Sequence, residues 1–427
     1  MRIWDSKYET MPASELEQLQ LERLQSTLYR IHRHGVTFYR KRFSEMGLDP
    51  ENLESLKDLE RLPFTTRHDL KESYPYDMFA VPLRDVVRVH EISGDLGIVG
   101  YTKNDLINWS NLVARVLYLS GIGENDTVQI THPYGLYPGA LGYHYAAELI
   151  GASVIPSSTA NTDKQLQILQ DYKSTAIIAT PSYARRLASE LNEKGTDPKT
   201  LSMRYAVLGS EPWTEQIRKD IEEGLFVSAT FNYGVASVFG PGIASECPEK
   251  DGLHIFMDHF IPEIIDPKTG KSLPVGREGE LVLTTLTREA FPILRYRTGD
   301  ITTLYYDKTI CPCGRTHLKM MPVAKRVDDL IVFNGINIYP QQIEEFLVSS
   351  EGRTTKFGVI LTRKENRDFM DVFVEVSENI FADEMKVQKK IIEDMEYQFQ
   401  RRFEVAASIK PVERGSLHGS KKVVDKR

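Results

Sequence analysis

The three cysteines of the chain fall into one set with a histidine, and their spacing suits a metal ion. Cys311 and Cys313 form a Cys-x-Cys pair on a predicted tight turn, and upstream Cys247 precedes His254 with six residues between them. Three thiolates and one imidazole are typical donors of a tetrahedral structural zinc site, which leaves no open position for catalysis. We therefore predict a closed Zn²⁺ site, with His317 as the alternative imidazole; buried free thiols are the other interpretation.

A carboxylate that could hold a nucleotide lies in the segment Tyr296-Arg-Thr-Gly-Asp300. We expect this segment to end a strand and to turn sharply at Gly299. An acidic residue just after a strand can accept hydrogen bonds from both hydroxyl groups of a ribose. Asp300 is therefore a candidate ribose ligand, and an aspartate of an ordinary hairpin turn is the alternative.

Short apolar runs between Val86 and Val282 alternate with helical patterns. This alternation predicts a parallel sheet with helices on its faces, so ligands are expected beyond the carboxyl ends of the strands. The predicted strands begin at Val128, Ser153, Ala176 and Tyr205. The predicted helices are Asn104–Ser120, Tyr143–Ile150, Asp163–Tyr172, Tyr183–Lys194 and Thr214–Gly224.

The regions on either side of this alternation have other patterns. Leucines at helical spacing predict one or two helices from about Ser14 to Phe43, with Ser14 and Glu17 as a capping box. Residues 252–322 are predicted to form an antiparallel lobe, with strands at Phe260–Asp266, Gly279–Thr285 and Asp300–Tyr305.

The last hundred or so residues predict a small α+β domain. Its expected elements are strands at Lys356–Leu361, Phe369–Val376 and Ala407–Pro411 and a helix at Asp383–Phe403. We therefore predict an α/β protein with two domains, a large one over residues 1–325 and a small, mobile one over residues 328–427.

Composition excludes several classes of protein. The 53 lysines and arginines against 60 aspartates and glutamates leave a net charge of −7, which argues against nucleic-acid binding through a basic surface. No apolar run reaches the roughly 20 residues of a membrane helix, and the first residues lack a signal-peptide core. Three cysteines cannot form a closed disulfide framework, so we expect a cytoplasmic protein.

Eight short segments follow one another along the chain in an order that is typical of one enzyme family. They are His132–Gly135, Thr180–Tyr183, Gly209–Trp213, Asn232–Gly234, Gly240–Gly242, Tyr296–Asp300, Lys325–Asp329 and Gly335–Pro340. Together they resemble the phenylacetate–coenzyme A ligase family of adenylate-forming enzymes, from about Tyr39 to Arg427. The resemblance implies binding of ATP or AMP with Mg²⁺, formation of an acyl-adenylate from an aryl carboxylate, and displacement of AMP by the thiol of CoA.

The resemblance also implies roles for individual residues. It places Tyr233 on the adenine, Asp300 on the ribose, and Lys325 and Asp328 at a hinge between the domains. The nucleotide-binding set is Gly209, Ser210, Glu211, Asn232, Tyr233, Gly234, Asp300 and Arg326. The acyl pocket, suited to a flat hydrophobic acid, would be His132, Tyr134, Tyr137, Phe239 and Ile243, with core packing as the alternative for each. A homodimer is expected from the resemblance alone.

The sequence departs from the family pattern at three positions of the ATP chemistry. In the stretch Ile92–Tyr101, Asp95 and Leu96 replace two threonines of the phosphate loop, and about three residues are missing. Ser237 replaces a glutamate that helps to hold Mg²⁺, and Glu246 lies at the wrong offset to substitute. The lysine that serves adenylation aligns with Gly419; Lys421 and Lys422 are weak substitutes.

Three functions are therefore weighed. The first is an acid–thiol ligase that acts on an aromatic or hydrophobic acid through an acyl-adenylate. The second is a family member that does not adenylate and instead binds an acyl-AMP, an acyl-CoA or an aromatic acid for acyl transfer. The third is a non-catalytic binding protein. We favour the ligase, because the whole organisation of the chain agrees with it, while fold alone decides no function.

Overall fold

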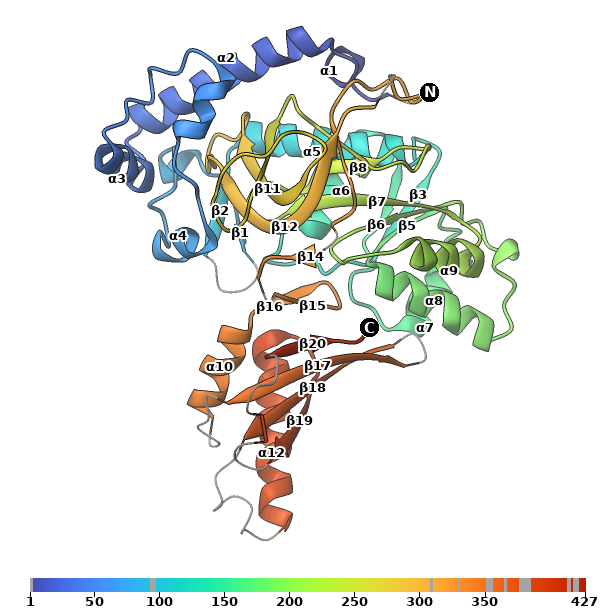
Figure 1. The fold of residues 1–427 in the computed structure, drawn as a ribbon. Coiled ribbons are helices and arrows are strands. Elements are labelled where there is room, and N and C mark those ends of the chain that lie inside the picture. The colour runs from blue at the N-terminus through green and yellow to red at the C-terminus, as the bar shows by residue number, and fades with distance from the viewer. Residues whose placement is uncertain are drawn as a thin grey trace. The chain divides into compact units, whose positions relative to one another are not determined.

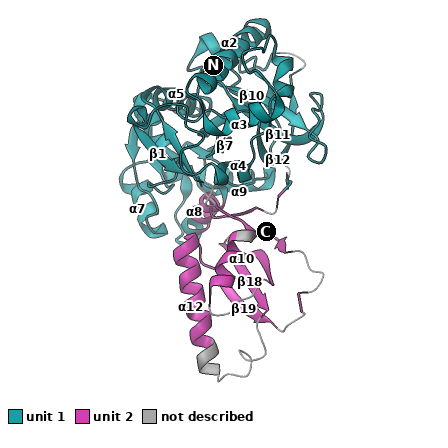
Figure 2. Ribbon diagram, turned by 90° about the vertical axis from the view of Figure 1, so that its left-hand side faces the viewer, with its two compact units in different colours: residues 1–181, 190–327 teal, residues 182–189, 328–427 magenta. Residues whose placement is uncertain are grey.

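The computed structural model describes residues 3–92, 97–307, 310–323, 325–328, 330–350, 356–364, 367–375, 385–412, 416–417 and 422–427. The chain divides into two compact units (Figure 2). The first unit comprises Met1–Pro181 and Glu190–Val327, and the second comprises Ser182–Ser189 and Asp328–Arg427. The second unit includes part of helix α8 (Pro181–Glu193). The domain boundaries given above therefore stay a prediction.

The first unit begins with helices that pack on its core. They are α1 (Ser6–Glu9), α2 (Ala13–Arg33), α3 (Thr37–Met46), the 3₁₀ turn η1 (Leu56–Arg61) and α4 (Arg67–Glu72). Leu24 and Leu28 of α2 are fully buried, as their helical spacing predicts. The predicted capping box at Ser14 is wrong, because α2 starts at Ala13 and Pro12 stands before its first turn without a side-chain cap.

Five strands form the parallel half of the main sheet, in the order β7-β6-β5-β3-β4 (Figure 1). They are β3 (Thr127–Ile130), β4 (Ser153–Ile155), β5 (Ala176–Ala179), β6 (Tyr205–Leu208) and β7 (Ser228–Val235). Five helices alternate with these strands along the chain: α5 (Lys103–Leu119), α6 (Gly139–Leu149), α7 (Thr162–Asp171), α8 and α9 (Glu215–Leu225). The 3₁₀ turn η3 (Pro198–Thr200) lies between α8 and β6. The predicted parallel sheet is confirmed, although α6 begins at Gly139 rather than at Tyr143.

The sheet continues through antiparallel strands. From β7 the order runs β8-β9-β13-β12-β11-β10, and β14 pairs with β12. Their bounds are β8 (Gly240–Glu246), β9 (Leu253–Ile255), β10 (Phe260–Ile265), β11 (Glu278–Thr285), β12 (Tyr296–Tyr305), β13 (Lys319–Met320) and β14 (Lys325–Arg326). The antiparallel lobe and its three predicted strands are confirmed by β10, β11 and β12.

Strand β12 does not end at Gly299, so the predicted turn there is wrong. The strand runs on to Tyr305, and Gly299 lies inside it with a φ of 78°. The pairing with β11 shifts register at this point, since Glu280 pairs with Ile301 but Val282 pairs with Arg297. Gly299 therefore marks a β-bulge, a position where glycine tolerates a positive φ. Asp300 follows the bulge in the middle of the strand.

A two-stranded hairpin carries the segment that resembles a phosphate loop. Strand β1 (Arg88–Glu91), which follows the 3₁₀ turn η2 (Leu83–Asp85), pairs with β2 (Ile98–Tyr101). The amide of Ile92 donates a hydrogen bond to the carbonyl oxygen of Gly97 at 2.9 Å, so the two ends of the connection are joined. Residues 93–96, among them Asp95 and Leu96, lie outside the described part.

The C-terminal region of the second unit is the predicted α+β arrangement. It contains the hairpin β15 (Ile331–Phe333) and β16 (Ile336–Ile338), helix α10 (Pro340–Ser349), and a sheet in the order β19-β18-β17-β20. The sheet strands are β17 (Phe357–Lys364), β18 (Arg367–Glu375), β19 (Ser408–Val412) and β20 (Val423–Asp425), with helix α12 (Met385–Phe403) between β18 and β19. Phe346, Phe399 and Phe403 pack together in its own core. None of the helices described in either unit has the length and hydropathy of a membrane span.

Candidate active site

Asp300 is the centre of a small hydrogen-bonded group in the first unit. The hydroxyl of Tyr233 on β7 donates to Oδ2 of Asp300 at 2.5 Å. On the other side, Nη1 of Arg326 forms an ion pair with Oδ1, and Nη2 donates to the carbonyl oxygen of Thr298 at 2.9 Å. Asp300 and Arg326 are also paired across β12 and β14. Strands β7 and β12 thus bring together Tyr233 and Asp300, which the resemblance assigns to adenine and ribose, and β14 adds Arg326.

The electrostatics of this group keep Tyr233 protonated. Burial raises the pKa of Tyr233 well above its usual value, and the negative charge of Asp300 raises it further. A neutral phenol beside a carboxylate can only donate its proton in a hydrogen bond. Tyr233 therefore holds one oxygen of Asp300 in place, and the Arg326 guanidinium holds the other.

Glu280 on β11 supports the bulge, and sequence reasoning missed it. Its Oε1 accepts a hydrogen bond from the amide of Gly299 at 3.2 Å, and its Oε2 lies 2.5 Å from Nη2 of Arg297. The carboxylate is buried, with 1% of the residue exposed. A glutamate directly before the apolar run Leu281–Leu283 was the available signal, because a buried charge needs partners. Glu280 fixes the backbone directly before Asp300.

The predicted adenine segments lie against each other at the carboxyl ends of β6 and β7. Nδ2 of Asn232 donates to the carbonyl oxygen of Leu208 at 2.9 Å. A Cβ atom on Gly209 would stand 2.9 Å from that same Nδ2, so only glycine fits there. Ser210 has a φ of 68°, and Glu211 is half-buried. Gly234 is exposed in β7, where the segment Asn232–Gly234 forms a strand instead of a loop.

The predicted acyl-pocket residues divide into a polar group and a core group. His132 stacks on Tyr143 with ring centroids 6.1 Å apart, and burial lowers the pKa of His132 to about 4. The hydroxyl of Tyr134 lies 3.0 Å from Nδ1 of His144, whose Nε2 lies 3.1 Å from Glu148 Oε1. Because Glu148 accepts from Nε2–H, Nδ1 accepts from the Tyr134 hydroxyl.

Phe239 and Ile243 belong to the main hydrophobic core and are fully buried. The Phe239 ring lies 6.4 Å from that of Tyr101 and 6.0 Å from that of Phe260. Tyr137 is half-buried. The role of these three residues as walls of an acyl pocket stays a prediction.

Ser237 and Glu246, the two residues considered for the Mg²⁺ position, both have partners within the protein. Ser237 is buried and its hydroxyl is hydrogen-bonded to Tyr296. Glu246 forms a buried ion pair with Arg218, with Oε1 2.5 Å from Nη2, and its Oε2 accepts the amide of Phe231 at 2.8 Å. The Glu246 carboxylate thus has partners within the protein, and its unsuitability as a Mg²⁺ ligand stays a prediction.

The described lysine candidate and the hinge lysine each lie close to a glutamate. Nζ of Lys422 lies 2.6 Å from Oε2 of Glu344 on α10 and 4.9 Å from the Phe357 ring centroid. Lys421 and Gly419 lie outside the described residues. Nζ of Lys325 lies 3.1 Å from Glu278 Oε1, and Asp328 begins the second unit. The catalytic and hinge roles stay predictions.

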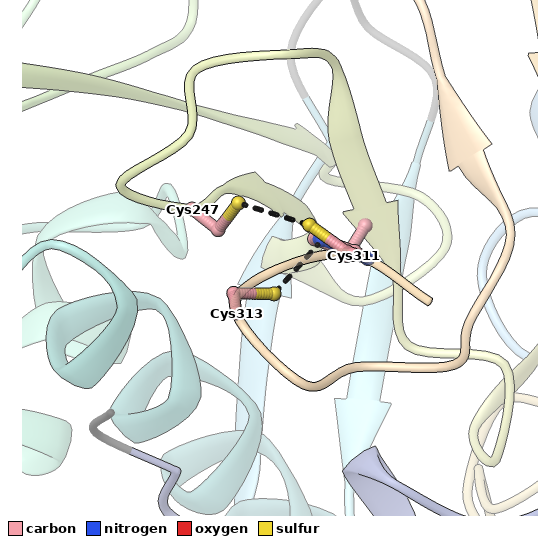
Figure 3. Close-up of side chains that lie close together, drawn as sticks. Cys247, Cys311 and Cys313 are labelled. Atoms are coloured by element: carbon pink, nitrogen blue, oxygen red, sulfur yellow. Dashed lines mark hydrogen bonds between the residues drawn. The ribbon is translucent and has the colours of Figure 1, made fainter. Parts of the chain in front are cut away.

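Three thiols and one imidazole converge as the sequence predicts (Figure 3). One ligand atom from each of Cys247, His254, Cys311 and Cys313 lies within 4.8 Å of the others, and all four residues are buried. The Sγ atoms of Cys247 and Cys311 are 3.8 Å apart, and Sγ of Cys313 lies 3.3 Å from Nε2 of His254. His317 is not in the cluster, because its ring nitrogens contact the carbonyl oxygens of Ile255 and Tyr8.

Comparison with family models and solved structures identifies the class of protein to which the chain belongs. A model of AMP-binding enzymes matches residues 101–286, and a model of the AMP-binding enzyme C-terminal domain matches residues 335–427. The chain is 28% identical to a 2-hydroxyisobutyryl-CoA ligase solved with 2-HIB-AMP and CoA, with a TM-score of 0.93 over 100% of this chain and 92% of that one. The fold is thus that of an adenylate-forming, AMP-binding enzyme.

Two curated relatives narrow the class. Phenylacetate-coenzyme A ligase of Thermus thermophilus is 44% identical over 385 residues, 89% of this chain and 86% of the relative. The Escherichia coli enzyme of the same name is 42% identical over 376 residues, 87% and 85% of the two chains. The chain belongs to the phenylacetate–coenzyme A ligase family. It is an acid–thiol ligase that acts through an acyl-adenylate, as the resemblance implied.

Proposed function

We propose that the protein activates a small aromatic or hydrophobic carboxylic acid with Mg·ATP and transfers the acyl group to the thiol of CoA. The observation that carries the nucleotide part is the position of Asp300 between Tyr233 and Arg326. A buried carboxylate held in place by the Tyr233 hydroxyl and the Arg326 guanidinium is a fixed acceptor of the kind that ribose hydroxyls need, while Tyr233 offers a ring to the adenine. The names of the relatives support an aromatic acid.

The chemistry has two steps that the site can serve. In the first, a carboxylate oxygen attacks the α-phosphorus of ATP, and pyrophosphate leaves with the electrons of the broken P–O bond. In the second, the CoA sulfur attacks the acyl carbonyl, its proton is lost, and AMP leaves. A neutral His132 adds no charge to the acyl site near pH 7, so the predicted pocket stays apolar and suits an aryl group.

A second candidate is a family member that receives a preformed acyl-AMP or acyl-CoA and only transfers the acyl group. The observation that favours it is that neither residue weighed as the Mg²⁺ ligand offers a free carboxylate, since Ser237 is neutral and Glu246 is paired with Arg218. The ion pair of Lys422 with Glu344 agrees with it. A protein that binds the same ligands without turnover is the third outcome.

One assay separates these functions. The purified protein is incubated with ATP, Mg²⁺ and a panel of aryl and aliphatic acids, and pyrophosphate release is followed with and without CoA. We expect acid-dependent release that CoA accelerates, together with a thioester product. Thioester formation from supplied acyl-AMP without pyrophosphate release would establish the second candidate. Thermal stabilisation by acyl-AMP with neither product would establish the binding protein.

We also propose a structural zinc ion at Cys247, His254, Cys311 and Cys313. Two sulfurs that bind one tetrahedral zinc at about 2.3 Å stand about 3.8 Å apart, which agrees with the Sγ atoms of Cys247 and Cys311 at 3.8 Å. Four donors fill the coordination shell, so the ion would stabilise the antiparallel lobe and take no part in the reaction. Nε2 of His254 is the ring nitrogen that faces Sγ of Cys313, at 3.3 Å, and is therefore the nitrogen that would bind the ion.

Metal analysis of protein purified without chelator tests the zinc site, with about one zinc per chain expected. Stripping the metal with a strong chelator should lower the unfolding temperature, and Cys313→Ser should do the same. A zinc content below about 0.2 equivalents would contradict the proposal, because a closed site of this kind retains its metal.

A homodimer and a cytoplasmic location complete the proposal. All three cysteines are free and buried, which suits a reducing compartment. Sedimentation of the purified protein tests the dimer, which rests on the family resemblance.

A further inference from the structure

Arg288 is a fully buried cation that the reaction scheme above does not use. It lies between β11 and β12, with 0% of the residue exposed. Its Nη1 donates to the carbonyl oxygen of Val238 at 2.9 Å, and its Nη2 donates to that of Gly100 at 3.1 Å. Its Nε is buried without a partner. In the described part of the chain, no carboxylate lies within ion-pair distance of this guanidinium.

Aromatic rings surround the side chain. The guanidinium carbon lies 4.1 Å from the centroid of the Tyr101 ring and 4.8 Å from that of Phe239. Ring faces and carbonyl oxygens lower the cost of burying a guanidinium, but they do not neutralise it. Arginine does not lose its proton in proteins, so Arg288 carries a full positive charge inside the first unit.

The two carbonyl partners of Arg288 come from the segments nearest to the departures from the family pattern. Gly100 lies on β2. This strand begins directly after Gly97, whose carbonyl oxygen accepts the hydrogen bond from the amide of Ile92. Val238 follows Ser237, the residue at the position of the missing Mg²⁺ ligand. Arg288 therefore ties the strand that leaves the predicted phosphate loop to the segment that follows Tyr233.

The field of Arg288 reaches the other strand of the hairpin. His90 on β1 has a lowered pKa, chiefly because of burial, and the charges of Arg88 and Arg288 lower it further. His90 is 2% exposed, and its Nε2 is buried without a hydrogen-bond partner. A positive field at both strands of a glycine-bearing hairpin favours an anion beside it.

We propose that Arg288 is a positioning residue for the β- and γ-phosphoryl groups of ATP. It fixes two segments that border these groups and supplies buried positive charge where the loop and the Mg²⁺ position have lost ligands. This inference rests on the proposed function, because it assumes that ATP is the nucleotide. Its consequence is selective: Arg288 serves the triphosphate and not the acyl-AMP, which carries one phosphoryl group.

The test compares the two half-reactions in Arg288→Met and Arg288→Lys. In acid-dependent ATP–pyrophosphate exchange, Arg288→Met should raise the KM for Mg·ATP about tenfold, because a unit charge at this depth is poorly screened. Thioester formation from supplied acyl-AMP and CoA should stay within about threefold of the unmodified enzyme, since its substrate lacks the outer phosphoryls. Arg288→Lys keeps the charge and should recover most of the ATP affinity.

Each outcome decides the matter. If both half-reactions fall equally in Arg288→Met, or if neither changes, the inference is overturned. If Arg288→Met does not fold, Arg288→Gln, which also removes the charge, takes its place: a loss confined to the ATP step supports the inference, and an equal loss in both steps overturns it. Calorimetric binding of Mg·ATP makes the same comparison without an acid. Failure of the proposed function would then appear as absent turnover with ATP binding intact, and absent ATP binding would overturn the inference.

Discussion

Asp300 shows how a single carboxylate is prepared for a ligand. One oxygen accepts from the Tyr233 hydroxyl and the other pairs with Arg326, so neither oxygen can rotate away. A carboxylate oxygen has two lone pairs, so a carboxylate can accept hydrogen bonds from ribose hydroxyls as well as from the side chains that hold it. The affinity for a nucleotide then depends on donors that do not themselves touch the ribose.

Replacing Tyr233 with phenylalanine tests this dependence. Tyr233→Phe keeps an aromatic ring for the adenine but removes the hydrogen bond to Asp300, which is charge-assisted and worth about 1.5–3 kcal/mol. We expect the KM for ATP to rise about tenfold or more, together with a fall of a few degrees in the unfolding temperature. Steady-state kinetics with varied Mg·ATP measures the effect.

Tyr305→Phe is the matched control, because Tyr305 lies on β12 like Asp300. Its hydroxyl donates a hydrogen bond to the carbonyl oxygen of Asp251 and does not contact Asp300. Equal losses in both variants would show that Tyr233 acts through folding alone.

At the scale of elements, the bulge in β12 determines where Asp300 points. Between the pairs Glu280–Ile301 and Val282–Arg297, β12 advances four residues while β11 advances two, so the bulge contains residues without a partner on β11 and locally bends β12. Glu280 stabilises this geometry through the amide of Gly299 and through Arg297. The bulge, and not a turn at the end of a strand, is therefore the element that positions the carboxylate.

Gly299→Ala should disturb both stability and nucleotide binding. A Cβ atom at a φ of 78° costs about 1–2 kcal/mol, and relief of the strain would move Asp300. We expect a lower unfolding temperature and at least a severalfold weaker binding of ATP, measured by calorimetry.

The control for Gly299→Ala is Gly276→Ala. Gly276 has a φ of 92° with open space around it, so the backbone strain is similar but Asp300 is not affected. Unchanged ATP binding in Gly299→Ala would show that the bulge does not position the site.

The sequence predicted regular elements well and irregular ones poorly. The buried run Ala176–Ala179 and the helix Asp163–Tyr172 have clear periodicity, and β5 and α7 follow it. Strands β7 and β8 were missed because Asn232-Tyr-Gly and Gly240-Pro-Gly are composed of turn-forming residues. In the structure these glycines give room for close backbone contact instead, since a Cβ on Gly234 would collide with the carbonyl of Gly240.

The clustering of Cys247, His254, Cys311 and Cys313 was predicted from local spacing, and it is confirmed, while the role of these residues and of Asp300 stays a prediction. The contacts around Asp300 were not predicted. The bond between Tyr233 and Asp300 joins residues 67 positions apart, and only the strand order β7 to β12 creates it. Glu280 and Arg288 gave no motif, because their function depends on burial, which a short pattern does not reveal.

At the scale of the whole molecule, buried neutral histidines make stability depend on pH. Burial lowers the pKa of His259 to about 3 and that of His132 to about 4. The unfolded chain therefore binds more protons than the folded one between these values and about pH 6.5, so the free energy of unfolding falls as pH falls through that range. The limiting slope is about 1.4 kcal/mol per pH unit for each histidine.

Denaturant unfolding between pH 7.5 and pH 5 measures this slope. His259→Gln should be less stable at pH 7.5, because it loses the contact with Thr287 Oγ1, but should show a shallower loss toward pH 5. His68→Gln, at an exposed histidine, is the control and should keep the original slope. A slope in His259→Gln equal to that of the unmodified protein would contradict the assignment.

The ion pair between Glu9 and Arg315 closes a very long loop. The two residues are 306 positions apart, Glu9 is 0% exposed and Arg315 is 2% exposed. The hydroxyl of Thr316 also donates to the carbonyl oxygen of Met11. Removal of residues 1–11 would thus break a buried ion pair whose arginine lies two residues from Cys313, at a cost of about 3–5 kcal/mol. We expect such a deletion to lower the unfolding temperature and to weaken retention of the zinc ion proposed above.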